Sequence, residues 1–294
     1  MLTRLLRTLG LDLGRQADMM PAAADNPDGF WENLRFVQLN DELLNNVGAA
    51  WDLPPSREQA FAQDSLRPLR AKAELLIASF EEDKAWGWKD PRNCLTLPFW
   101  QSLLPELKTV IIVRNPLEAA YSMHRRNGTS YALGLRLWEI YNRRLLAHTQ
   151  PEQRLITNYQ AFFENPRSEL ERLARFAELP KQDITATADL VTQTRRHTTF
   201  TQEQLIDAGV SEDIIGLYTS MVAQATATDG AGGDTAQLRS DQDATESNAS
   251  LAGSANYLNL TVPESENVRR ELAQRRGSEI QHQENIQQLQ ARIE

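Results

Sequence analysis

Residues 109–116 read Thr109-Val110-Ile111-Ile112-Val113-Arg114-Asn115-Pro116, in which five β-branched residues run into a cation, a capping residue and a proline. The β-branched run predicts a buried strand that ends at Arg114. Asn115 is a favoured N-cap residue and Pro116 suits the first helical position, so a helix is expected to start at once. A helix N-terminus beside a fixed positive charge is suited to an anionic ligand.

The same order of residues occurs earlier, in Ala85-Trp86-Gly87-Trp88-Lys89-Asp90-Pro91-Arg92. It predicts a strand over 85–89 that ends at Lys89, with Asp90 as N-cap and Pro91 as the first helical residue. Two helix N-termini, each beside a cation, are what a polyanionic ligand requires.

Residues 1–224 alternate short apolar runs with amphipathic segments, which predicts crossover connections and a parallel sheet in an α/β fold. Ligands of such sheets bind beyond the carboxyl ends of the strands, where Lys89 and Arg114 are placed. A third strand is predicted over 154–159. Helices are predicted over 34–46, 57–81, 117–126, 131–148 and 166–177.

Composition excludes several classes of protein. The net charge of −9 argues against a general nucleic-acid surface. The single cysteine, Cys94, excludes an internal disulfide and fits a reducing compartment, so we expect a cytoplasmic protein. No pair among the four histidines has metal-ligand spacing, so no metal site is expected. No apolar run approaches the roughly 18 residues that span a membrane.

The character of the chain changes after the domain over 1–224. Residues 225–262 are rich in Ala, Asp, Gly, Ser and Thr, which predicts a disordered linker. Residues 263–294 predict a polar helix whose sparse apolar positions fit a coiled-coil seam loosely. Such a helix would allow self-association.

A phosphate site is predicted where the strand over 109–114 meets the next helix. Asn115 and Ser122 are seven residues apart and face the same side of a helix, and Arg126 lies one turn further. Arg114 would contact a phosphate through its guanidinium fork, supported by Ser122 and Arg126. The alternative is a well-capped helix with a solvated basic end.

Taken together, these motifs resemble a known family. A strand ending in Arg114-Asn115-Pro116, with Ser122 eight residues after the arginine, resembles the 3′-phosphate motif of sulfotransferases that use 3′-phosphoadenosine 5′-phosphosulfate (PAPS). The segment 86–92 is similar to the Trp-x-x-Lys-Asp-Pro-Arg segment of bacterial-type members. Further resemblance lies in 25–33 and in Asn158-Tyr159 followed by Glu164-Asn165-Pro166, so that it spans residues 1 to about 200.

The resemblance implies a P-loop-NTPase-like parallel sheet flanked by helices. It also implies transfer of the PAPS sulfonate to a hydroxyl or amine of a carbohydrate, lipid or peptide acceptor. Arg114 and Ser122 would hold the 3′-phosphate, and Tyr159 would lie near the adenosine. Arg195 and Arg196 stand where such domains often end in a basic segment, and are assigned to the nucleotide.

Two residues are candidates for catalysis. Lys89 would contact the bridging oxygen and stabilise charge on the leaving phosphate; the alternative is a solvated lysine at a strand end. Glu32 is the available general base, if its pKa is raised near Trp31. The alternative for Glu32 is an acid in the first turn of a helix, where the dipole favours it.

One family signature is missing, the Gly-x-x-Arg-Ser-Gly-Thr-Ser loop that binds the 5′-phosphosulfate. The chain begins with Met1-Leu2-Thr3-Arg4-Leu5-Leu6, which is similar to the helix directly after that loop. We expect either a coding start further upstream or a protein that lacks half of its donor site. Losing several charge-assisted hydrogen bonds of roughly 1.5–3 kcal/mol each would weaken donor binding a thousandfold or more.

Three functions therefore stay open. The leading hypothesis is a sulfotransferase that is catalytic when its N-terminus is complete. The second is a non-catalytic nucleotide-binding or scaffold member of the same fold, with the C-terminal helix as an interaction tail. The third is a nucleotide kinase of related fold, against which stands the absence of a Gly-x-x-x-x-Gly-Lys-Ser/Thr segment.

Overall fold

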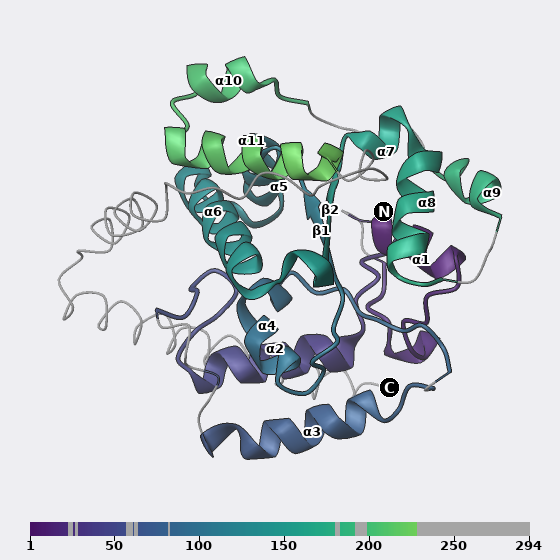
Figure 1. Ribbon diagram of the computed structural model, residues 1–294. Helices are drawn as coiled ribbons and strands as arrows, with labels where there is room; N and C mark the ends of the chain where they lie inside the picture. The colour runs from purple at the N-terminus through teal and green to yellow at the C-terminus, as the bar shows by residue number, and fades with distance from the viewer. Residues whose placement is uncertain are drawn as a thin grey trace, which may run out of the picture. The chain divides into compact units, whose positions relative to one another are not determined.

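The computed structural model describes residues 1–22, 26, 29–56, 61, 64–81, 83–179, 183–191 and 199–227. Within them, helices flank a small parallel sheet, which is an α/β arrangement (Figure 1). The predicted linker, apart from its first three residues, and the predicted helix over 263–294 lie outside the described residues.

The predicted helices form, with some changes at their ends. Two of them, α2 (Leu34–Asn46) and α6 (Tyr131–His148), match the prediction residue for residue. The helix predicted over 57–81 is shorter in the described residues, because Pro68 in the first turn of α3 (Arg67–Ile77) favours a helix start there. The other helices are α1 (Leu2–Thr8), α4 (Asn93–Gln101), α5 (Pro116–Asn127), α7 (Ala161–Glu164), α8 (Pro166–Phe176), α9 (Ile184–Ala188), α10 (Gln202–Asp207) and α11 (Glu212–Ala227), and short 3-10 helices cover Gln16–Asp18, Asp64–Leu66 and Pro151–Gln153.

The sheet of the described residues consists of β1 (Thr109–Val113) and β2 (Arg154–Asn158). The strands run parallel, with Val113 beside Asn158 at their carboxyl ends. The helices α5 and α6 form the crossover between them, as parallel pairing requires. Two of the three predicted strands are therefore confirmed, and Arg114 and Tyr159 leave the sheet at the same edge.

The predicted strand over 85–89 is wrong. Trp86 makes one isolated parallel bridge, in which Asp12 exchanges two backbone hydrogen bonds of 2.9 Å with the segment. Asp12 lies between Gly10 and Gly14, whose φ angles of 105° and 88° turn the backbone away on both sides. The segment therefore finds no second ladder partner in the described residues.

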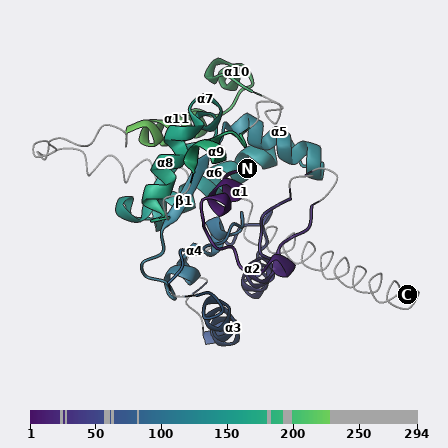
Figure 2. The same cartoon turned by 90° about the vertical axis from the view of Figure 1, so that its right-hand side faces the viewer.

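An aromatic-rich core lies among α2, α3 and α4 and includes Phe36, Phe80, Trp86, Trp88 and Trp100. The rings of Phe36 and Trp88 stack with centroids 4.4 Å apart, and those of Phe80 and Trp86 are 4.5 Å apart. In this part of the molecule α2 and α3 lie side by side, as two views show (Figures 1 and 2). Trp86 and Trp88, two residues apart, thus both pack into this core, and the segment that carries them is not part of the sheet.

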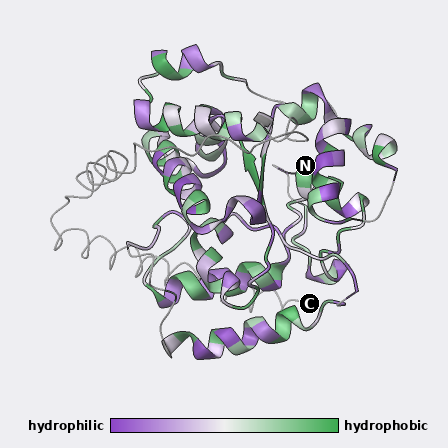
Figure 3. Cartoon of the chain, in the orientation of Figure 1, coloured by the Kyte–Doolittle hydropathy of each residue, from purple (hydrophilic) through white to green (hydrophobic). Residues whose placement is uncertain are grey.

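A second core joins β1 to α5, α6 and α11. Here α5 and α6 approach so closely that a Cβ atom added at Gly134 would lie 2.9 Å from the Cα of Ala120. A third core packs α1 and α8 against β2. Hydrophobic and hydrophilic residues alternate around the helices (Figure 3), and no helix of the described residues is long and apolar enough to cross a membrane.

Candidate active site

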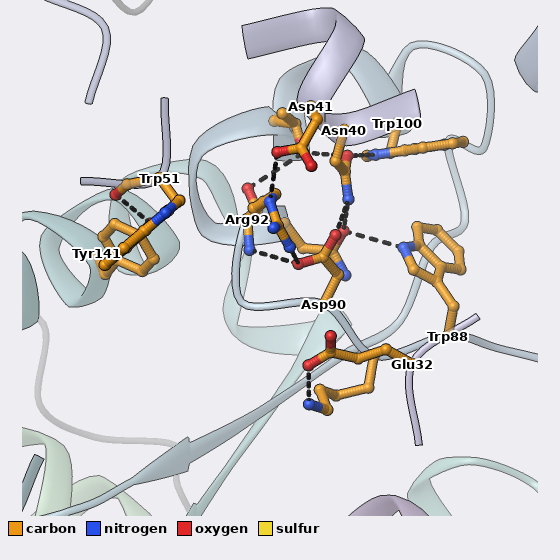
Figure 4. Close-up of polar contacts among 12 residues, drawn as sticks. Glu32, Asn40, Asp41, Trp51, Trp88, Asp90, Arg92, Trp100 and Tyr141 are labelled. Carbon is orange, nitrogen blue, oxygen red and sulfur yellow. Dashed lines mark hydrogen bonds and ion pairs between the residues drawn. The ribbon is translucent and has the colours of Figure 1, made fainter. Parts of the chain in front are cut away.

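Lys89 and Glu32 are in contact, although 57 residues separate them in the sequence. The Lys89 Nζ atom donates a short, ion-paired hydrogen bond to Glu32 Oε1 (Figure 4). The Glu32 side chain is 9% exposed and that of Lys89 is 39% exposed. A buried carboxylate is therefore placed against a cation that solvent and ligands can reach.

The backbone before Glu32 has an unusual conformation. Trp31 has a φ angle of 60°, in the left-handed region that a bulky residue rarely adopts. The Glu32 carbonyl accepts a hydrogen bond from Met20 N at 2.7 Å, and Asn33 caps α2 by accepting from Arg35 N. Glu32 thus precedes the N-cap, so the alternative that placed it in the first helical turn is wrong.

Asp90 is the buried anchor of the turn that carries Lys89, not the N-cap that the sequence predicts. Its Oδ1 atom accepts from both the backbone N and the Nη1 of Arg92, each at 3.0 Å. Arg92 also donates to Asp41 Oδ1 at 2.6 Å. Since Asp90 holds this turn, α4 begins three residues later, at Asn93.

Asn40 of α2 connects this turn to α4 (Figure 4). Its Nδ2 atom donates to Asp90 Oδ2 and to Asn93 Oδ1, both at 2.9 Å. Its Oδ1 atom accepts from Thr96 Oγ1 and Trp100 Nε1, both at 2.8 Å. All four hydrogen-bonding positions of one buried amide are used, which fixes the position of the turn after Lys89.

Arg114 lies between a carboxylate and an aromatic ring. Its Nε atom donates to Glu118 Oε2 at 2.9 Å, and its guanidinium carbon lies 4.8 Å from the centroid of the Tyr159 ring. Its two terminal nitrogens make no hydrogen bond within the described residues. The structure therefore brings Arg114 and Tyr159 together, and Glu118 occupies one side of the guanidinium fork.

Asn115 is the N-cap of α5, as predicted, and Pro116 is the first helical residue. The Asn115 Oδ1 atom accepts from Leu117 N at 2.9 Å, while Nδ2 donates to Phe200 O at 3.0 Å. The cap thus also ties α5 to the segment before α10.

The remaining predicted residues are less closely gathered. Ser122 is half-buried on α5, and its hydroxyl group makes no hydrogen bond within the described residues. Arg126 is exposed near the end of α5, with its guanidinium 5.6 Å from the centroid of the Phe30 ring. Arg195 and Arg196 lie outside the described residues.

The sequence also matches a model of a known protein family. The model described as the sulfotransferase family matches residues 17–183, which is more than half of the 294-residue chain. The chain belongs to the sulfotransferase family. Its general chemistry is therefore that of sulfonate transfer, and the match includes Glu32, Lys89, Arg114 and Tyr159. Neither a comparison with curated proteins nor one with solved structures finds a significant match.

Two cavities are present in this sulfotransferase-family protein. One of about 790 Å³ lies between the Asp12–Asp18 segment and the end of α3, with Asn33 and Arg35 in its wall. Another of about 770 Å³ is lined by α10 and α11. Neither is lined by Glu32, Lys89 or Arg114.

The described residues of this family member show no further reactive centre. Burial, reinforced by the nearby Asp90 carboxylate, raises the pKa of the Cys94 thiol to about 12. Burial likewise raises the pKa of Tyr141, whose hydroxyl donates to Trp51 O at 2.6 Å. Both groups stay protonated at neutral pH and are poor nucleophiles. The described residues hold no cluster of three His, Cys, Asp or Glu side chains that could share a metal ion.

Sequence reasoning missed two partners of the predicted residues. Glu118 is four residues after Arg114, a spacing that signals an ion pair along a helix start. Asn40 has no such signal, because its partners Asp90 and Trp100 are 50 and 60 residues away.

Proposed function

We propose that this protein transfers the sulfonate group of PAPS to a hydroxyl or amine of an acceptor. The observation that carries the proposal is the contact between Lys89 and Glu32, which pairs a reachable cation with a buried carboxylate. Transfer requires both groups at one place. The parallel pair β1–β2 with its helical crossover supports a P-loop-NTPase-like fold as part of the same proposal.

In this mechanism Glu32 takes the proton from the acceptor as the acceptor oxygen or nitrogen forms its bond to sulfur. The bond between sulfur and the bridging oxygen breaks, and adenosine 3′,5′-bisphosphate leaves. Lys89 stabilises the negative charge that builds on the leaving phosphate. Because Lys89 and Glu32 pair with each other at rest, binding of the two substrates would separate them and give each its own partner.

The nucleotide is proposed to bind at the edge where β1 and β2 end. The free terminal nitrogens of Arg114 would contact the 3′-phosphate together with the Ser122 hydroxyl, which has no partner of its own in the described residues. Tyr159, already against the Arg114 guanidinium, would face the adenosine. Arg126 is proposed as a longer-range electrostatic contribution from the end of α5.

Sulfonate transfer is tested with labelled PAPS and a panel of hydroxyl and amine acceptors. Lys89→Gln is expected to lower the rate about 10²–10³-fold, and Glu32→Gln about 10²–10⁴-fold. The matched controls are Lys72→Gln and Glu42→Gln, because Lys72 and Glu42 form an exposed ion pair of 2.6 Å. Equal rates in the test and control variants would contradict the assignment.

Nucleotide binding is tested separately, by calorimetry with adenosine 3′,5′-bisphosphate. Arg114→Ala is expected to weaken binding about 10–100-fold, the value of one charge-assisted hydrogen bond. Arg143→Ala is the control, because Arg143 pairs with Glu139 through Nε at 2.9 Å with the same i,i+4 spacing. Binding without transfer to any acceptor would instead indicate the non-catalytic nucleotide-binding member.

A further inference from the structure

Phe30 and Trp31, the two residues before Glu32, each lie against an arginine of a different helix. The guanidinium carbon of Arg126, on α5, lies 5.6 Å from the centroid of the Phe30 ring. That of Arg7, in the last turn of α1, lies 5.4 Å from the centroid of the Trp31 ring. Both distances are within the range of a cation–π attraction. The segment that leads into Glu32 is therefore held from two helices.

The backbone at Trp31 needs such support. Its φ of 60° costs free energy in a bulky residue and persists only where the surroundings hold it. The Nη1 atom of Arg7 is buried and has no hydrogen-bond partner within the described residues. Since a cation–π attraction is stronger where the cation has lost water, the Arg7 guanidinium is well suited to hold the Trp31 ring and, with it, the left-handed backbone.

The direction of the Glu32 side chain depends on the peptide planes on both sides of its Cα atom. On the carboxyl side the backbone is fixed, because Met20 N donates to the Glu32 carbonyl at 2.7 Å. The next side chain, that of Asn33, donates to Leu13 O at 3.0 Å. On the amino side is Trp31. A change of the Trp31 backbone to a negative φ would therefore turn the Glu32 Cα–Cβ bond and move the carboxylate out of its ion pair.

We propose that Phe30 and Trp31 are positioning residues: held by the two arginines, their rings keep the Glu32 carboxylate in its ion pair. The catalytic consequence rests on the proposed function, in which Glu32 takes the proton of the acceptor. The ion pair with Lys89 can be followed without turnover. Because Arg126 lies on the helix proposed to bind the 3′-phosphate, the Phe30 contact also connects the donor site to the general base.

The ion pair is followed in the full chain by acetylation with acetic anhydride, in which labelling of Lys89 is measured by mass spectrometry relative to labelling of Lys72. An ammonium group that loses its carboxylate gives up its proton more readily and is acetylated faster. Trp31→Leu is expected to raise the relative labelling of Lys89 about 3-fold, as Glu32→Gln does. Trp31→Phe keeps a ring for Arg7 and should restore most of the native value.

The double substitution separates positioning from a general loosening of the structure. If Trp31 acts through Glu32, Trp31→Leu adds nothing to the labelling of Lys89 in a Glu32→Gln background. Additive increases would overturn the proposal. Phe176→Leu is the matched control, because Lys108 lies 5.7 Å from the Phe176 ring centroid. This control should leave the labelling of Lys89 unchanged, and a rise equal to that of Trp31→Leu would also overturn the proposal.

If Trp31→Leu does not fold, Phe30→Leu and Phe30→Tyr make the same comparison, and native labelling in the folded leucine variants contradicts the positioning role. With an acceptor in hand, Trp31→Leu should lower kcat about 10–100-fold and leave KM for PAPS nearly unchanged. A raised KM with native kcat would count against it. Because labelling needs no turnover, a failure of sulfonate transfer in the native protein refutes the proposed function alone.

Discussion

The turn at Lys89-Asp90-Pro91 and the turn at Arg114-Asn115-Pro116 have the same order of residue types but are held by different interactions. The first depends on the buried Asp90 carboxylate and on Asn40, which reaches it from α2. The second depends on a strand ladder, a local cap and the close packing of α5 on α6. The helix cap of the second turn is made within the turn itself, by Asn115, whereas the first turn is held by a residue 50 positions away in the sequence.

The largest loss of stability is expected from a substitution that disrupts the first turn. Asp90→Ala should lower the free energy of unfolding by about 3–5 kcal/mol, because it removes the buried carboxylate that accepts from Arg92 Nη1 and from Asn40 Nδ2. Asp41→Ala removes the other carboxylate on Arg92, which is 44% exposed, and should cost about 1 kcal/mol or less. Urea unfolding followed by circular dichroism compares the two, and equal losses would show that burial of Asp90 is unimportant.

A smaller effect is expected from the packing that supports the second turn. Gly134→Ala should cost about 1–3 kcal/mol, because the added Cβ atom would lie 2.9 Å from Ala120. Ala120→Gly in the same protein should recover part of the loss. Gly216→Ala in α11 meets no atom within 4 Å and should instead stabilise by about 0.5–1 kcal/mol. Thermal unfolding of the native protein and these three variants shows whether the loss at Gly134 comes from the close approach of the helices or from replacing a glycine in a helix.

The cap of the second turn should contribute less again. Asn115→Ala is expected to cost about 1 kcal/mol, since Leu117 N loses its acceptor. Asn115→Asp keeps that acceptor but removes the donor to Phe200 O. Unfolding in urea should therefore rank the aspartate variant between the native protein and Asn115→Ala. A loss as large as that of Asp90→Ala would remove the contrast between the two turns.

Ionisation of the Cys94 thiol, which follows the first turn, should not change the free energy of unfolding near neutral pH. The folded thiol, with a pKa of about 12, keeps its proton where an unfolded thiol, with the usual 9.0, loses it. The Cys94 contribution to stability is thus complete below pH 9 and is lost as the pH rises from about 9 to 12. Comparison with Cys94→Ala over this range isolates it. The native thiol should also resist iodoacetamide at pH 9 and react in urea; rapid alkylation of the folded protein at that pH would contradict the raised pKa.

The difference between the turns also explains what the sequence could predict. Helices α2 and α6, strands β1 and β2 and the Asn115 cap follow from periodicity and from residues within one or two turns. The strand over 85–89 was an incorrect prediction because a ladder depends on a partner elsewhere, and here a single residue, Asp12, supplies it.

The candidate site divides in the same way. The cation–Asx–proline order placed Lys89 and Arg114 at chain turns, and the family resemblance put forward Glu32 as a candidate general base. The contact of Glu32 with Lys89 could not be derived from spacing, since 57 residues separate them. Nor could the position of Glu32 outside α2, because it depends on the left-handed backbone of Trp31.

The fully bonded amide of Asn40 has a consequence for hydrogen exchange. Its two Nδ2 protons are in hydrogen bonds to Asp90 and Asn93, and the indole proton of Trp100 is in a hydrogen bond to Asn40, with Asn40 and Trp100 both 0% exposed. Because these bonds join α2 to the turn and to α4, we expect solvent deuterons to reach all three protons when α2 separates from them. These side-chain protons should therefore exchange at the rate at which the turn after Lys89 opens. Their exchange rates would then report the stability of that turn.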